Sequence, residues 1–214
     1  MPLLTESYQQ QAQFWPADGR HILAQFDDES IVLYQAYTPA IGHFAAANGV
    51  LGGPFRYTRM SWVKPNFLWI MFRSGWGTKP NQEVTLALRV RRTFFDALLG
   101  EAVPSTWNHD LPPTREAWSQ EVERSHVRLQ WDPDHHPSGA QLERRAIQLG
   151  LRGPTLEAFG GRELLEVQDI SEFVAEQRHA LASRGVTALQ TPRERVYRPA
   201  DPAIAARIRL ADLT

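Results

Sequence analysis

The segment FRYTRMSWVKPNFLWIMFRSGWG, residues 55–77, joins a cationic aromatic stretch to an apolar run. It contains four cationic side chains and three tryptophans but no carboxylate. Lys64-Pro65 can open a helix because proline is tolerated in the first turn, and Ser74-Gly75 is a stop signal. The run between them, Phe67 to Phe72, is apolar on every face. The segment therefore predicts a short buried helix that follows a strand end carrying Arg59.

The flanking patterns predict strands and helices in irregular alternation. IVLYQAY, residues 31–37, is rich in residues that favour strands, and TPAIGHFAAANG, residues 38–49, has helical spacing between Thr38 and Gly49. WDPDHHPSG, residues 131–139, is typical of a turn. Further strands are predicted at 83–91, 127–131, 146–151, 163–170 and 193–199, and further helices at 93–100, 115–123, 151–160 and 171–185. This alternation predicts an α+β fold.

Composition limits the possible classes of protein. With 214 residues, of which 43% are hydrophobic, the chain is expected to form a single globular domain. Its net charge of −1 provides no overall field that would attract nucleic acid or a membrane. The absence of cysteine excludes disulfides, thiolate nucleophiles and cysteine metal sites. No signal peptide or transmembrane run is recognisable, so a cytoplasmic location without membrane contact is expected.

Charge is distributed unevenly along the chain. No Asp or Glu occurs between Glu29 and Glu83, and this gap contains Arg56, Arg59, Lys64, Arg73 and Lys79. A cationic segment with aromatic side chains suits a ligand that combines phosphate with a flat ring, because arginine binds phosphate oxygens and Trp or Tyr stacks on rings. The alternative is a buried helix and strand whose arginines face water.

Two further patterns have weaker implications for function. The turn around Asp132 holds two aspartates and two histidines, but adjacent histidines point apart and no further ligand is indicated, so no metal site is predicted. In ERRAIQLGL, residues 143–151, Gln148 is predicted to face away from the core and could bind a ribose hydroxyl. The alternative is a polar residue on the solvent side of a strand.

Several segments, in order, resemble a family of uncharacterised, mainly bacterial proteins that share a domain of unknown function. The segments that carry the resemblance are IVLYQAY, RMSWVKPNFLWIMFRSGWGTK, LQWDP, RRAIQLGL and RERVY. The resemblance implies an N-terminal extension at 1–20, one domain at 21–198 and a C-terminal tail at 199–214. It does not itself imply an activity.

The order of the first strand, FRYTRMSW, the helix and EVTLALRVRRTFFDALL also resembles the NAD-binding half of ADP-ribosyltransferases, especially the DNA-modifying toxins. This implies a split mixed or antiparallel sheet with flanking helices. In that superfamily the first strand carries a His or Arg that contacts the NAD ribose, and a late strand usually carries a catalytic Glu. Gln35 and Gln148 stand at these two positions here, and Arg59 matches the arginine in the aromatic stretch.

The resulting hypothesis is a protein that binds NAD as a substrate, or a related nucleotide, and transfers ADP-ribose to a nucleic-acid base or a small acceptor. The resemblance places Arg59 and Gln148 at the catalytic positions. The residues expected to contact NAD are Tyr34, Gln35, Trp62, Lys64, Arg73 and Arg145. One alternative is a module that binds single-stranded DNA or RNA without catalysis, using the same arginines and aromatics. The other is a scaffold without a ligand.

Overall fold

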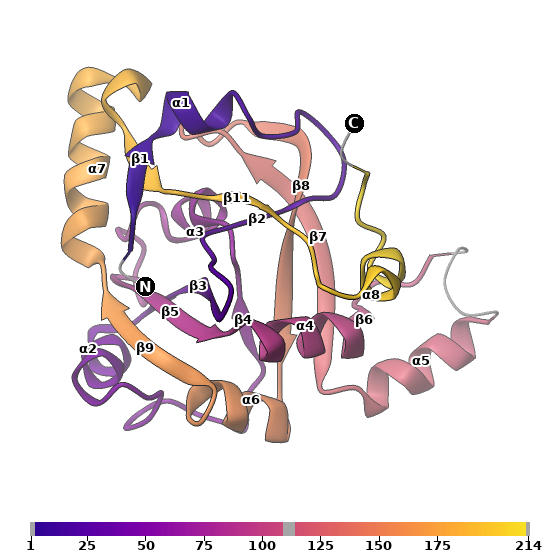
Figure 1. Cartoon of the computed structure of the whole chain (residues 1–214). Helices are drawn as coiled ribbons and strands as arrows, with labels where there is room; N and C mark the ends of the chain where they lie inside the picture. Colours follow the sequence, from indigo (N-terminus) through magenta and orange to yellow (C-terminus); the bar gives the residue numbers. More distant parts are fainter. Residues whose placement is uncertain (1–2, 109–113, 213–214) are drawn as a thin grey trace.

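Two sheets form the centre of the fold in a computed structural model that describes residues 3–108 and 114–212. The first has the order β3-β5-β9, formed by Ser30–Tyr37, Val84–Arg91 and Leu164–Asp169. The second has the order β4-β8-β7-β6, formed by Ser61–Val63, Gln141–Leu151, Val127–His135 and Val103–Pro104, with β6 and β7 parallel. Figure 1 shows β9 and β5 on the left and the long β7–β8 hairpin on the right. The predicted α+β class is confirmed.

A backbone bridge joins the two sheets. The Tyr34 amide donates to the Lys64 carbonyl at 2.6 Å, and the Lys64 amide donates to the Tyr34 carbonyl at 3.3 Å. Lys64 directly follows β4, so this pair holds the edge of the second sheet against β3. The bridge determines where side chains from both sheets meet.

Two short strand pairs connect the ends of the chain to the central domain. β1 (Thr5–Ser7) pairs with β10 (Gln190–Pro192), and β2 (Ile22–Ala24) pairs with β11 (Arg195–Tyr197). The helix α1 (Tyr8–Ala12) follows β1, and α8 (Pro202–Arg207) lies near the C-terminus. Both ends therefore contain secondary structure that packs on the domain, as Figure 1 shows.

The remaining helices surround the sheets (Figure 1). They are α2 (Pro39–Asn48), α3 (Phe67–Ser74), α4 (Arg92–Glu101), α5 (Arg115–Arg124), α6 (Gly153–Gly160), α7 (Ser171–Arg184) and the short 3₁₀ helix η1 (Val186–Ala188). The predictions of α2, α5, α6 and α7 are confirmed to within a few residues. The helix predicted at 93–100 extends to Glu101, so Gly100 lies inside it and does not end it. Among the described residues, no helix has the length and apolarity needed to cross a bilayer.

The helix α3 is buried as its sequence predicts. Five consecutive residues starting at Phe67 are at most 8% exposed, whereas Phe72 is 43% exposed. Its start differs from the prediction because Lys64 and Pro65 precede the helix. The N-cap is Asn66, whose side chain accepts a hydrogen bond from the Trp69 amide at 2.7 Å. Gly75 ends the helix at a φ of 60°, which glycine adopts without strain.

The predicted turn at residues 131–139 is mostly strand. β7 continues to His135 and β8 begins at Gln141, which makes a longer hairpin than the two short strands predicted. The cross-strand hydrogen bonds of this hairpin offset the weak strand preference of Asp and Pro. A register shift between Pro133 and His135 accommodates the proline, which cannot donate to the ladder. This extension places Asp132 on a strand.

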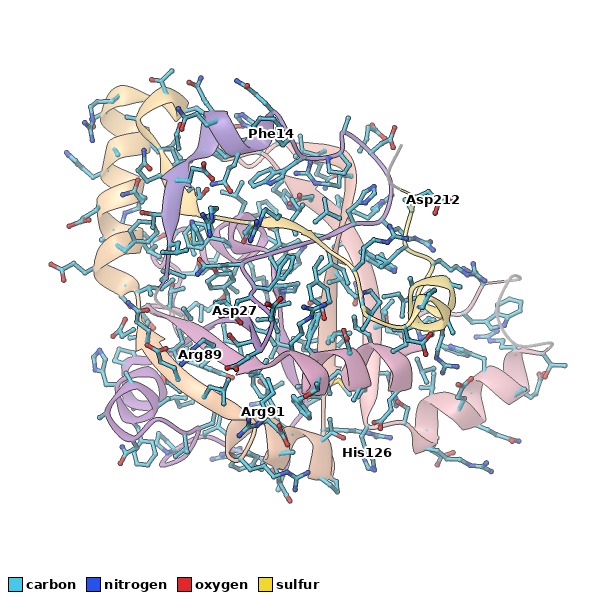
Figure 2. All side chains as sticks on the ribbon, in the orientation of Figure 1. Phe14, Asp27, Arg89, Arg91, His126 and Asp212 are labelled. Carbon is cyan, nitrogen blue, oxygen red and sulfur yellow. The ribbon has the colours of Figure 1, made fainter. Side chains whose placement is uncertain are left out.

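Exposed ion pairs connect neighbouring strands away from this hairpin. Arg89 on β5 contacts Glu166 at 2.9 Å, and Arg91 approaches Glu163 at 3.6 Å. Both arginines are labelled on the β5 side of the molecule in Figure 2. Because water screens such pairs, each contributes little to stability.

A buried carboxyl group supports the start of α3 and gives a testable pH dependence. Glu194 is 2% exposed, and its Oε1 accepts a hydrogen bond from the Phe67 amide at 2.6 Å. Burial raises the pKa of Glu194 well above its ordinary value. The folded state therefore binds this proton more tightly than the unfolded state, and stability falls as the pH rises above the ordinary glutamate pKa.

We expect Glu194→Gln to remove this pH dependence while keeping an acceptor for the Phe67 amide. The melting temperature of the variant should exceed that of the wild type by a margin that grows as the pH rises from about 4.3, the ordinary glutamate pKa. Thermal unfolding followed by circular dichroism across this range tests the prediction. A margin that stays constant with pH would contradict it.

Candidate functional site

A cavity of about 690 Å³ lies where the two central sheets meet. Side chains from β3, β4, β7, β8 and α3 line it. It brings together five of the eight residues predicted for the site, namely Gln35, Trp62, Lys64, Arg73 and Gln148. They come from segments more than 100 residues apart, so the fold itself creates the cavity.

One wall is formed by a hydrogen-bonded group centred on Gln35. Its Nε2 donates to Ser61 Oγ at 2.8 Å and to the Trp62 carbonyl at 3.0 Å. Its Oε1 accepts from the Tyr37 hydroxyl at 2.6 Å, and burial raises the pKa of that hydroxyl. The Gln35 side chain is thereby fixed in orientation and connects β3 to β4.

Another part of the cavity lining is a carboxylate held by two amides. Asp132 Oδ1 accepts from Gln130 Nε2 at 2.8 Å, and Oδ2 accepts from Gln148 Nε2 at 2.6 Å. Gln130 and Gln148 are directly paired across the β7–β8 ladder. Asp132 is paired with Ala146, whose small side chain leaves room for the hydrogen bond between Gln148 and Asp132. Burial raises the pKa of Asp132, while the hydrogen bond from Gln130 and the charge of Lys64 oppose this effect.

Lys64 places an amine inside the cavity. The residue is 4% exposed, and its Nζ lies 4.0 Å from the centroid of the Trp69 ring. Burial is the main cause that lowers the pKa of Lys64 to about 7; the charge of Asp132 opposes the change, and that of Arg73 adds to it. Arg73 itself is exposed, at the end of α3. The cavity thus has a cationic rim and a buried amine.

The Trp62 ring is positioned by a glycine on the facing strand. Trp62 pairs with Gly150 across β4 and β8. A Cβ added at Gly150 would lie 2.7 Å from the sulfur of Met60 and 3.0 Å from the Trp62 ring. A side chain at this position would therefore displace the tryptophan from the cavity wall.

Arg59 lies beside the cavity. It is exposed and lines a neighbouring pocket of about 320 Å³ together with Arg56 and Phe55. The two pockets share Tyr37, Met60 and Ser61. Arg59 and Gln148 therefore line adjoining depressions.

The other two predicted residues do not line the cavity. Tyr34 is fully buried, and its ring packs edge-on against Phe67 with centroids 5.6 Å apart. It contributes to the site through its backbone bridge to Lys64. Arg145 is exposed, and its backbone amide donates to the Gly19 carbonyl at 2.7 Å.

Sequence reasoning did not identify Gln130 and Asp132 as site residues. The alternation in VRLQWDP contained the necessary signal, because Leu129 and Trp131 belong to or pack on the main core while Gln130 and Asp132 face the other way. The prediction ended this strand at Trp131, which assigned Asp132 to a turn. Tyr37 and Ser61 carried no comparable signal.

Comparisons with known proteins identify the family. A search of curated proteins finds no significant match. Residues 21–197, most of the chain, match a family model described as a domain of unknown function, DUF4291. The chain therefore belongs to the DUF4291 family.

Proposed function

We propose that this protein binds NAD or a related nucleotide in the cavity and transfers its ADP-ribose group, as an ADP-ribosyltransferase-like enzyme. The observation that carries the proposal is the half-buried Asp132 carboxylate, held by Gln130 and Gln148 in a cavity with an arginine at its edge. A fixed carboxylate can stabilise positive charge that develops on a bound sugar.

The arrangement of the sheets supports this proposal. The two central sheets are joined at β3 and β4, α3 follows β4, and the cavity lies at the junction. The sequence resemblance implies a split sheet with flanking helices, and this arrangement supports the proposal. The volume of about 690 Å³ falls in the usual range for small-ligand sites, roughly 300–1,000 Å³.

The lining groups suit the parts of a dinucleotide. Arg73 at the edge can bind a phosphate, and the ring of Trp62 offers a flat apolar surface for a base or nicotinamide. The amide oxygen of Gln148 is available for a ribose hydroxyl because its Nε2 already donates to Asp132. Gln35 acts indirectly, by holding β4 in place.

The reaction would break the bond between the ribose C1″ and nicotinamide, and the electron pair would leave with nicotinamide. Asp132 would stabilise the oxocarbenium character of the ribose as this bond lengthens. It would then accept the proton of the attacking hydroxyl, amine or water, for which its raised pKa is suited. Gln130 and Gln148 would orient the carboxylate without adding charge.

The binding part of the proposal predicts the effect of Arg73→Ala. Loss of a charge-assisted hydrogen bond to phosphate should weaken NAD binding by about 1.5 to 3 kcal/mol. Isothermal titration calorimetry with NAD measures this, and Arg89→Ala is the matched control because Arg89 pairs with Glu166 outside the cavity. Equal NAD affinity in wild type and Arg73→Ala would contradict the assigned position of the phosphate.

Binding of single-stranded nucleic acid remains a second candidate because of the adjoining pocket. Arg56, Arg59 and Phe55 line this pocket next to the cavity, which offers phosphate contacts and a stacking surface. This candidate predicts oligonucleotide binding that weakens steeply with salt and is lost in the Arg56→Ala/Arg59→Ala double variant. NAD binding that survives this double variant would separate the two functions.

A further inference from the structure

The use of lysine in this chain is selective. Of its 23 cationic residues only Lys64 and Lys79 are lysines. Arginine stays charged at any physiological pH, whereas lysine can lose its proton when buried. One of the two residues capable of this change therefore lines the cavity.

The surroundings of Lys64 differ from those of a structural cation. Its amine forms no hydrogen bond or ion pair with any residue of 3–108 or 114–212, and it rests on the face of Trp69. The charged groups that act on it are Asp132 from β7 and Arg73 from α3. Burial lowers the pKa of Lys64 to about 7, so a large fraction of the amine is neutral at neutral pH. Lys79, in contrast, is exposed, and its Nζ donates to the Arg73 carbonyl at 2.8 Å.

The backbone at Lys64 is held on both sides. It forms the bridge with Tyr34 that joins the two sheets, and Pro65 follows it with a restricted φ. The amine is thus presented to the cavity from a rigid element. Such placement favours reaction with a bound ligand because little motion remains to be lost.

We propose that Lys64 is a nucleophilic amine that forms an imine with the aldehyde group of an anionic ligand in this cavity. The ligand class is a phosphorylated sugar in its open-chain form, which includes the terminal ribose of ADP-ribose. The inference shares the cavity of the proposed function but requires no cleavage of nicotinamide.

The reaction is balanced without any redox partner. The lone pair of Nζ attacks the carbonyl carbon, the carbonyl oxygen takes a proton, and the nitrogen loses one, which gives a neutral carbinolamine. The hydroxyl then takes a second proton, the C–O bond breaks, and water leaves as the C=N bond forms. Loss of the remaining proton from nitrogen gives the imine. Asp132, in the same cavity with a raised pKa, supplies and accepts these protons. Arg73 binds the phosphate of the sugar.

Reductive trapping tests the inference directly. The full chain is incubated with glyceraldehyde 3-phosphate and sodium cyanoborohydride, and peptide mass spectrometry measures the adduct at each lysine. We expect Lys64 to be modified at least about tenfold faster than Lys79 at pH 7. At this pH, well under about 1% of a lysine with an ordinary pKa is in the neutral form that can react. The rate at Lys64 should rise with pH through about 7, saturate with the aldehyde, and fall when ADP-ribose or glycerol 3-phosphate competes.

Two variants serve as matched controls. Lys64→Arg keeps the positive charge but has no lone pair to donate, so the adduct in the cavity should disappear. Lys79→Arg should leave the labelling of Lys64 unchanged. Faster labelling of Lys79 than of Lys64 in the wild type, or no protection of Lys64 by ADP-ribose, would overturn the inference even if Lys64→Arg does not fold.

The outcomes also separate this inference from the proposed function. Binding of NAD without labelling of Lys64 would overturn the imine and leave the proposed function standing. Protected labelling of Lys64 in a protein that shows no affinity for NAD would support the imine and reject NAD as the substrate.

Discussion

Replacing Asp132 with asparagine is expected to slow the release of nicotinamide from NAD by about 10²- to 10³-fold, the usual effect of removing one preorganised electrostatic group. Asparagine has the same shape, and its Oδ1 can still accept from one of the two glutamines, but it has no negative charge. The loss should appear in kcat, because the carboxylate is proposed to stabilise positive charge that develops on the ribose only in the transition state. NAD affinity should change little.

The measurement is the rate of nicotinamide release at saturating NAD, with affinity from calorimetry. Glu143→Gln is the matched control, since Glu143 is exposed on β8 and is absent from the lining of the cavity. An Asp132→Asn variant with wild-type turnover would show that another group stabilises the ribose. An equal fall in the rate of nicotinamide release in Asp132→Asn and Glu143→Gln would indicate a general effect of charge and no specific role for Asp132.

Replacing Lys64 with methionine is expected to stabilise the protein by up to about 5 kcal/mol at pH 6. Burial lowers the pKa of Lys64 from 10.5 to about 7, and each pKa unit corresponds to about 1.36 kcal/mol of lost stability when the amine is charged. The unfolded state binds a proton at this residue more tightly than the folded state. Wild-type stability therefore rises with pH between about 7 and 10.5, and the advantage of the variant fades over the same range.

Urea unfolding from pH 6 to pH 10 measures this effect. Lys79→Met is the control and should change stability by no more than about 0.5 kcal/mol, as is usual at exposed positions. A Lys64→Met variant that is less stable than wild type at pH 6 would show that the amine is held in the cavity as a favourable cation. Reactivity of the Lys64 amine would then lose its physical basis.

Some features of the fold could be predicted because they depend on local interactions. The apolar run from Phe67 to Phe72, followed by glycine, specifies a buried helix wherever it lies, and the strand predicted at 31–37 matches β3 to within one residue. The α+β class and the charge gap that contains Lys64 and Arg73 also follow from the order of residues. Of the five predicted residues that line the cavity, Trp62, Lys64 and Arg73 lie within residues 55–77, whereas the fold brings Gln35 and Gln148 to them.

The rest depended on which segments pair, and pairing is a long-range property. Asp132 became a strand residue because the β7–β8 ladder extends past Pro133, an extension that local preferences oppose. The register of the strands then decided which face of the sheet each side chain occupies, because successive side chains alternate between the two faces. Gln148 faces the cavity. Arg145, three positions earlier on the same strand, is exposed and does not line the cavity.

The sequence by itself determined the strand β3, the buried helix α3 and the cationic aromatic character of residues 55–77. Only the tertiary structure decided that the Asp132 carboxylate and the Lys64 amine share one cavity. Burial there raises the pKa of Asp132 and lowers the pKa of Lys64. The reason is physical: the pKa of a group depends on the water it loses and the charges it meets, and both are set by residues distant in the chain.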